Sequence, residues 1–268
     1  MIPKEVFHYT TTSIALDKIL FEKKLKIGQL KNTNDPKESG EYSFDTFVNA
    51  PWDIPPWKEK LRQIATPIKI NEWKILSVSI NHPDLESEQG LINPLLFGGY
   101  RPRMWAHYGE NHKGVCLKLN GNKLDEQIKK SLLDTKCEIF SGEVDCDDRW
   151  VNDGTSELID FDDISKLNDI ELKEWIREYF KKNHEKIFLT KSKEWESEHE
   201  FRWLVHNEKD SPEFIPIDDI VEEIFVGCDF HKTYYPSLYK LCKDLGIPAY
   251  EIFWNNGKPG RKKIDFDK

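Results

Sequence analysis

The sequence has few cysteines, no long apolar run and no excess of positive charge, and each shortage excludes a class of protein. The five cysteines are odd in number and include no Cys-x-x-Cys pair, so neither a disulfide framework nor a thiolate zinc site is expected. No stretch approaches the ~18 consecutive apolar residues of a membrane span. The first ten residues also lack the apolar run of a secretory leader. We therefore expect a cytoplasmic protein with reduced thiols and no membrane partner.

The charge balance is acidic, since 48 Asp and Glu residues against 39 Lys and Arg residues give a net charge of −9. A broad nucleic-acid groove needs clustered positive charge to displace counterions from phosphates, so this class is disfavoured, whereas a small local contact is compatible with the composition. Aromatic residues, by contrast, make up 12% of the chain. That much ring area is most stable when packed, which predicts a folded protein.

Hydrophobic patterning predicts an α+β fold with mixed, mainly antiparallel sheets and flanking helices. Strands are expected near residues 6–9, 25–27, 73–80, 114–119, 198–205, 223–226 and 249–254, and helices near residues 14–20, 102–110, 170–190 and 234–245. Residues 143–170 are rich in Asp and Glu with few matching cations. We expect a single domain over residues 1–268 with an acidic insertion near residues 143–170.

The first candidate segment is His8-Tyr9-Thr10, at the end of the first expected strand. Alternate residues of a strand point to the same side, so His8 and Thr10 can both bond to one ligand. The competing interpretation is a surface histidine beside a helix cap.

The second candidate segment contains Trp105 and Tyr108 next to a glycine turn. Aromatic side chains this dense can form a stacking platform for a flat heterocycle, although packing alone also explains them. His107 and His112 lie nearby, but no third ligand falls at a recognisable spacing, so no metal site is predicted.

The third candidate segment is the expected strand that carries Glu198, Glu200 and Arg202 on one face. Its other face is apolar and therefore expected to point inward. Arg202 can hold one carboxylate ionised while the other meets a substrate hydroxyl or a developing cation. The alternative is an exposed, ion-paired strand that contributes little stability. Lys191, just before this segment, is either a solvated loop charge or a phosphate contact.

Together these segments resemble a bacterial family known as domain of unknown function 2971. The shared motifs are an FHYT-like opening at residues 7–10, NDP-x-E at 34–38, W-x-x-Y-x-x-x-H-x-G-V-C-L at 105–117 and W-x-x-E-x-E-x-R at 195–202. The resemblance spans nearly the whole chain and implies no activity.

The order of residues is also similar to that of ADP-ribosyltransferases of the His-Tyr-Glu type. That resemblance implies a split sheet and NAD as co-substrate. The residues implied to bind NAD are His8, Tyr9, Thr10, Trp105, Tyr108 and Arg202, with Tyr108 stacking on nicotinamide. Glu200 or Glu198 would be catalytic. Between the two we favour Glu200 to stabilise the positive charge that builds on the ribose, with Glu198 orienting the acceptor or the ribose and Arg202 holding the pair ionised.

The resemblance thus implies either an ADP-ribosyltransferase that modifies a protein or nucleic-acid acceptor, or an NAD glycohydrolase. The implied setting is a toxin or phage-defence system. The acceptor and the oligomeric state stay open at this point. A second hypothesis is a non-enzymatic module that binds a nucleotide or nucleic acid around Trp105 and Tyr108. A third, less favoured, is a metal-dependent nuclease built on Glu198, Glu200 and the histidines.

Overall fold

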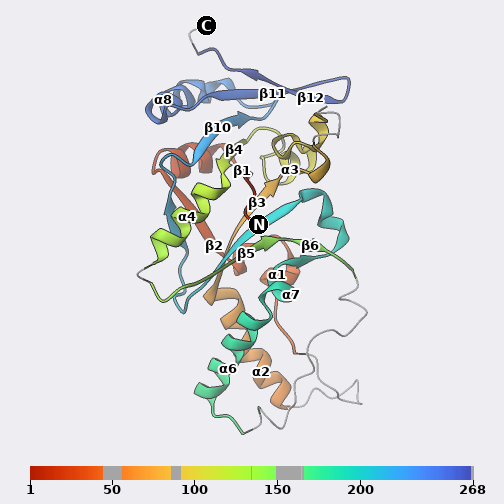
Figure 1. The fold of residues 1–268 in the computed structure, drawn as a ribbon, viewed down its shortest axis with the longest axis vertical. Coiled ribbons are helices and arrows are strands. Elements are labelled where there is room, and N and C mark those ends of the chain that lie inside the picture. Colours follow the sequence, from red (N-terminus) through yellow and green to blue (C-terminus); the bar gives the residue numbers. More distant parts are fainter. Residues whose placement is uncertain (45–55, 86–91, 134, 149–163, 165, 267–268) are drawn as a thin grey trace.

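The computed structural model describes residues 1–268 except 45–55, 86–91, 134, 149–163, 165 and 267–268. Its centre is a large twisted sheet, with α2 and α6 at one end of the molecule and α8, β11 and β12 at the other (Figure 1). The strands are β1 (Glu5–Thr10), β2 (Lys24–Gln29), β3 (Trp73–Ile80), β4 (Val115–Asn120), β5 (Glu138–Glu143), β6 (Asp145–Cys146), β7 (Thr190–Lys191), β8 (Glu200–His206), β9 (Glu213–Pro216), β10 (Val221–Val226), β11 (Ala249–Asn255) and β12 (Lys258–Lys263).

The helices flank this sheet. The α-helices are α1 (Pro36–Ser39), α2 (Pro56–Pro67), α3 (Pro102–His107), α4 (Gly121–Leu132), α6 (Asp169–Lys182), α7 (His184–Phe188) and α8 (Tyr235–Leu245). Two π-helical segments are η1 (Ile14–Leu20) and η3 (Ile68–Glu72). The 3-10 turns are η2 (Leu30–Asn32), η4 (Pro83–Leu85), η5 (Pro94–Leu96), η6 (Gly98–Tyr100), η8 (Lys193–Glu198) and η9 (Lys232–Tyr234).

The strand order is β12-β11-β10-β4-β1-β3-β2-β9, with β8 paired to β3 and β5 paired to β8. Within this sheet the pairs are antiparallel except β10 with β11. The predicted α+β class with mainly antiparallel strands and flanking helices is confirmed. Among the described residues, no helix is both long and apolar enough to cross a membrane.

An opening in the sheet lies beside β3. On one edge of β3, Ser79 pairs with Phe7 of β1 and Ile75 pairs with Gly28 of β2, while β8 occupies the opposite edge. Residues 76–78 therefore have no strand partner on the β1 and β2 side among the described residues. Backbone groups without a ladder partner must bond elsewhere, so an opening of this kind can receive a ligand. Whether it corresponds to the split sheet of an ADP-ribosyltransferase stays a prediction.

Apolar residues on both faces fix these layers. The largest core cluster packs η1, α4 and α8 against one face of the sheet, with Leu16, Ile128 and Leu238 among its members. A second cluster joins α2, α6 and α7 to β3 and β8 through side chains such as Leu61, Ile176 and Phe188. A smaller aromatic cluster packs α3 against β1 and β10. Because the sheet is covered on both faces, polar side chains on its strands can be buried.

Three sequence predictions need correction. The expected strand over residues 198–205 begins at Glu200, because Glu198 ends η8 and His199 adopts a left-handed conformation with φ 43°. The face of β8 that carries Glu200 and Arg202 is not exposed, since every residue of β8 is buried. The single helix expected over residues 170–190 is two helices, α6 and α7, which meet at Asn183.

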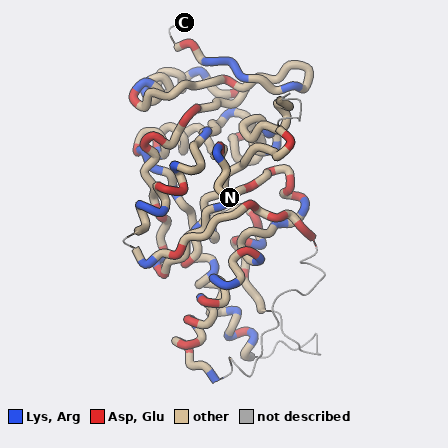
Figure 2. Tube along the Cα trace, viewed as in Figure 1, with Lys and Arg blue, Asp and Glu red and all other residues tan. Residues whose placement is uncertain are grey.

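The acidic segment lies largely outside the described residues, which omit 149–163 and 165. Elsewhere Lys, Arg, Asp and Glu alternate along the chain rather than forming one basic face (Figure 2).

Candidate active site

A cavity of about 760 Å³ occupies the opening between β1 and β2. Its walls include residues of β1, β2, β3, η1 and the segment 32–38, together with Tyr108, Lys191, Glu198 and Glu200. The volume falls within the range of roughly 300–1,000 Å³ that is usual for small-molecule sites. His8, Tyr9 and Thr10 also line it, so most of the predicted site residues meet at this one cavity.

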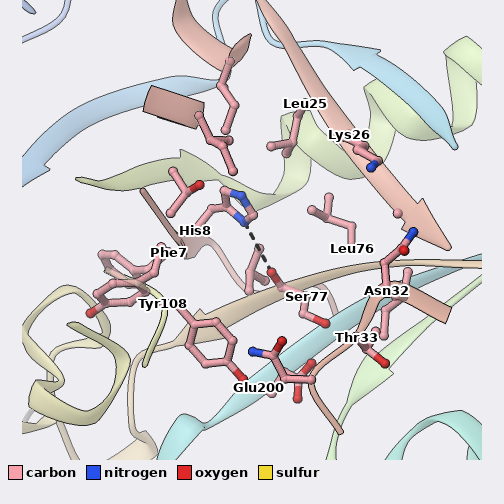
Figure 3. Close-up of a pocket in the computed structure, with 18 of the residues that line it drawn as sticks. Phe7, His8, Leu25, Lys26, Asn32, Thr33, Leu76, Ser77, Tyr108 and Glu200 are labelled. Carbon is pink, nitrogen blue, oxygen red and sulfur yellow. Dashed lines mark hydrogen bonds between the residues drawn. The ribbon is translucent and has the colours of Figure 1, made fainter. Parts of the chain in front are cut away.

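Strand register shows that the cavity passes through the sheet. Directly paired residues share a face, so Phe7, Ser79 and Glu200 lie on one face. His8, next to Phe7, projects toward the other face. Its Nδ1 lies 3.4 Å from the backbone oxygen of Ser77, across the opening (Figure 3). His8 and Glu200 therefore approach the cavity from opposite faces of the sheet.

The tautomer of His8 follows from this contact. A carbonyl oxygen only accepts hydrogen bonds, so Nδ1 must carry the proton and Nε2 is left as an acceptor. Burial lowers the pKa of His8, although the bond to Ser77 acts in the opposite direction. The ring is therefore neutral at physiological pH and can accept a hydrogen bond from a ligand hydroxyl.

Glu200 is held by two cations. Arg202 Nε donates to Glu200 Oε1 at 2.6 Å, and Arg202 Nη2 donates to Oε2 at 3.0 Å. Lys191 Nζ lies 2.8 Å from the same Oε2. Burial alone would raise the pKa of Glu200, but Arg202 and Lys191 outweigh it and lower that pKa to about 2. Glu200 is therefore ionised, with both oxygens occupied.

Glu198 has a different environment, although it also lines the cavity and is only 2% exposed. Its Oε2 accepts from Lys191 Nζ at 3.2 Å, and the Tyr108 phenol lies near enough to the carboxylate to lower its pKa by hydrogen bonding. Its Oε1 is the oxygen left without a close hydrogen-bond partner among the described residues. Burial raises the pKa of Glu198, and the negative charge of Glu200 raises it further. An unsatisfied buried carboxylate oxygen is costly unless a ligand or proton satisfies it.

Tyr108 lies close enough to Glu198 to be affected by its charge. Burial raises the pKa of the Tyr108 phenol, and the charge of Glu198 raises it further. The phenol therefore stays protonated and can act as a hydrogen-bond donor at the cavity wall. Figure 3 shows Tyr108 and Glu200 on the same side of the cavity.

Two predicted ligand contacts are not at the cavity. Trp105 is fully buried, packs edge to face on Tyr9 at 5.1 Å between ring centroids, and donates from Nε1 to Gly99. It packs behind the wall and does not line the cavity. Arg202, 1% exposed, also lies behind the wall, because it bonds to Glu200, Glu38 and the Phe188 carbonyl oxygen. The hydroxyl of Tyr9 is likewise already bonded, to the Gly98 carbonyl oxygen at 2.6 Å.

Sequence reasoning gave no role to Glu38, although it lies in the NDP-x-E motif. Asp35 caps α1 by accepting from the backbone N–H of Lys37 at 2.8 Å, with Pro36 as the first helical residue. This short helix directs Glu38 to Arg202, to which it is bonded. The Asp-Pro pair was the available signal, since it is typical of a helix start.

The buried cluster has more negative than positive groups. Its carboxylates are Glu38, Glu198 and Glu200, and its cations are Lys191 and Arg202. Lys191, noted in the sequence only as a loop charge or phosphate contact, contacts all three carboxylates. Burial lowers the pKa of Lys191, but the negative charges of Glu200, Glu38 and Glu198 together outweigh it and raise that pKa overall. With every group ionised, these five groups carry one negative charge in excess, and Lys37 and Lys69 also act electrostatically on Glu38. The carboxylates Glu198 and Glu200 are the charged groups of this cluster that would meet a developing positive charge in the cavity.

Comparison with known proteins gives one match. Residues 104–203 match the family described as "Protein of unknown function (DUF2971)". This supports the resemblance to that family, and the matched stretch contains Tyr108, Lys191, Glu198, Glu200 and Arg202. Neither a search of the curated proteins nor one of the solved structures found a match.

Proposed function

We propose that the protein is an NAD-consuming enzyme that transfers ADP-ribose from NAD to a protein or nucleic-acid acceptor, or to water. The observation that carries the proposal is the cavity that His8, Tyr108, Glu198 and Glu200 line together. These groups come from three separate segments of the chain and have the complementary properties that cleavage of the nicotinamide glycosidic bond requires. The opening of the sheet supports a split-sheet type of site.

The two carboxylates have separate roles in this reaction. Breaking the bond builds positive charge on the ribose, and the fixed negative charge of Glu200 stabilises that charge more in the transition state than in the ground state. Glu198 Oε1, which has no partner among the described residues, accepts a hydrogen bond from a ribose or acceptor hydroxyl. Environments that push two pKa values apart in this way are typical of acid and base pairs.

The remaining groups orient the substrate. Tyr108 provides an aromatic surface and a protonated phenol beside Glu198. His8 Nε2 provides an acceptor on the other side of the opening, and Thr10 a hydroxyl. The biological setting that we propose is an effector of the toxin or phage-defence kind, as the resemblance to ADP-ribosyltransferases implies.

The test is incubation of the purified chain with labelled NAD, with and without cell lysate. We expect nicotinamide release, with label transfer if a macromolecule is the acceptor. Glu198→Gln and Glu200→Gln should each lower the rate on the order of 10²–10³-fold, as loss of a preorganised charge-stabilising group does. The matched control is Glu196→Gln in the same turn, because Glu196 is exposed. No release by the wild type, or equal rates in Glu198→Gln and Glu196→Gln, would reject the proposal.

A nucleotide-binding module without catalysis is the alternative, and one observation favours it. Both oxygens of Glu200 are already bonded, as in a structural ion pair. This alternative predicts saturable nucleotide binding with no turnover of NAD. For the metal-dependent nuclease, the described residues offer no group of three or more His, Cys, Asp or Glu side chains placed to hold an ion.

A further inference from the structure

Two lysines of β2 face the same cavity from the side opposite β8. Paired residues share a face of the sheet, so Gly28 lies on the face of Ile75, and Ser79 on the face of Glu200. Ile75 and Ser79 are four positions apart on β3 and therefore point to the same face. Lys24 and Lys26 lie four and two positions from Gly28 along β2, so their side chains point to the same face as Glu200. Both line the cavity, and both are exposed. Figure 3 shows Lys26 on β2, across Leu76 and Ser77 from Glu200.

These lysines differ from the other cations at the cavity. Lys191 contacts three carboxylates, and Lys18 pairs with Glu22 at 3.3 Å. No ion pair or hydrogen bond joins the side chain of Lys24 or Lys26 to another residue in the described part of the chain. One wall of the cavity thus carries carboxylates that are paired with cations, and the wall formed by β2 carries two positive charges without a partner among the described residues.

Ser77 lies between these two walls. It belongs to residues 76–78, which have no strand partner on the β1 and β2 side among the described residues, and it is exposed to the opening. Its hydroxyl can donate to an anionic oxygen. Ser77 therefore places an exposed hydroxyl between the acidic wall and the lysines, in a cavity whose lining also includes apolar residues such as Leu76 and Val78.

We propose that Lys24 and Lys26 bind the diphosphate of the ligand, so that the cavity takes a nucleoside diphosphate extended by a second ribose. This deepens the proposed function and rests on it for the position of the second ribose at Glu198. Lysine ammonium groups bind phosphate as point charges, and two on one face suit two adjacent phosphates. The spacing of i and i+2 along a strand is roughly 6.5–7 Å, which spans a diphosphate.

The experiment measures binding of ADP-ribose and of adenosine to the full chain by calorimetry, so that no bond cleavage is needed. For the variant Lys24→Gln with Lys26→Gln, we expect ADP-ribose affinity to fall at least tenfold while any adenosine affinity stays unchanged. Rising salt should weaken ADP-ribose binding to the wild type more steeply than to the variant. The matched control is Lys123→Gln with Lys130→Gln, two exposed lysines of α4 that do not line the cavity. It should change the affinity less than twofold.

The binding measurements either support or overturn the diphosphate proposal. Equal ADP-ribose affinity in wild type and variant, an equal loss in the control, or no ADP-ribose binding by the wild type would overturn the diphosphate proposal. A variant with both lysines changed to Arg keeps the charge and should retain binding if the first variant loses it. Lysine-dependent ADP-ribose binding without NAD cleavage would uphold this proposal while rejecting the enzymatic function. NAD cleavage with no dependence on the lysines would do the reverse.

Discussion

At the scale of single residues, the buried charges around Arg202 determine both the stability of the wall and its chemistry. Taking charges out of water is costly, and the cost is offset here because Arg202 bonds to Glu200, Glu38 and a backbone oxygen. Lys191 provides the second cation. Removal of either cation would leave carboxylates buried without compensation, whereas removal of one carboxylate would leave the cluster balanced.

Replacement of Arg202 tests this balance. We expect Arg202→Met to lower the free energy of unfolding by about 3–5 kcal/mol, because it leaves three carboxylates with one cation. Adding Glu200→Gln should restore about 1 kcal/mol or more, since it removes one uncompensated charge. Urea unfolding of the two single variants and the double variant gives the coupling energy. Additive losses would show that the two side chains do not stabilise each other.

The same residues show what the sequence could and could not provide. The alternation from Glu200 to Val205 predicted correctly which side chains share a face of β8. It could not reveal that the polar face is buried, because the partner Glu38 is 164 positions away. Trp105 was misplaced for another reason, since dense aromatic residues predict packing and stacking equally well. The left-handed backbone at His199, which separates Glu198 from β8, has no reliable sequence signal in a histidine.

At the scale of elements, the turn after α3 positions Tyr108. Glu110, Asn111 and His112 are consecutive residues with φ between 51° and 66°. Glu110 also accepts from the backbone N–H of Thr12 at 2.9 Å, which joins this turn to the start of η1. Consecutive left-handed residues cost energy and persist only where their surroundings determine them. Here the surroundings include the backbone just after β10, where the Asp229 N–H donates to the His112 carbonyl oxygen at 3.0 Å.

Gly227, just after β10, is that point of contact. A Cβ there would lie 2.0 Å from the backbone oxygen of His112, so Gly227→Ala must displace the turn. We expect a loss of about 1–3 kcal/mol in stability and weaker ligand binding at Tyr108, measured by urea unfolding and calorimetry. Gly246→Asn is the control, because Gly246 has open space around it and Asn tolerates its φ of 69°. A Gly227→Ala variant as stable as wild type would contradict the contact.

The sequence predicted whether a segment is a helix or a strand more accurately than it predicted the residues at which that segment ends. Apolar periodicity located β1, β3, β4 and α8 because their side chains enter the core directly. The break between α6 and α7 escaped it, because Asn183 leaves the helical conformation, with φ −105° and ψ 18°, while the apolar spacing continues. The opening in the sheet was implied only by a resemblance, since no local pattern encodes which strands fail to pair.

At the scale of the whole molecule, stability should depend on pH through ion-paired carboxylates. Burial would raise the pKa of Glu72, but its bonds to Arg177 and His206 lower it to about 2, the value reached also by Glu200. A carboxylate with a lowered pKa adds stability above its unfolded pKa of about 4.3 and loses that contribution as the pH falls toward its folded pKa.

We therefore expect the free energy of unfolding to fall as the pH decreases from about 4.5 to 2. Glu72→Gln should be less stable at pH 7 and should reduce this slope by up to about 1.4 kcal/mol per pH unit, the value for one proton. Urea unfolding at several pH values measures it. Glu126→Gln, at an exposed site on α4, should keep the wild-type slope. A Glu72→Gln variant with an unreduced slope would show that this ion pair does not contribute.

The gap between β1 and β2 has one more consequence. Three successive residues of β3 have no strand partner on that side within the described parts of the chain. A ligand that binds in this gap only in the folded state would link binding to folding. It would raise the free energy of unfolding by an amount set by the ligand concentration and the affinity.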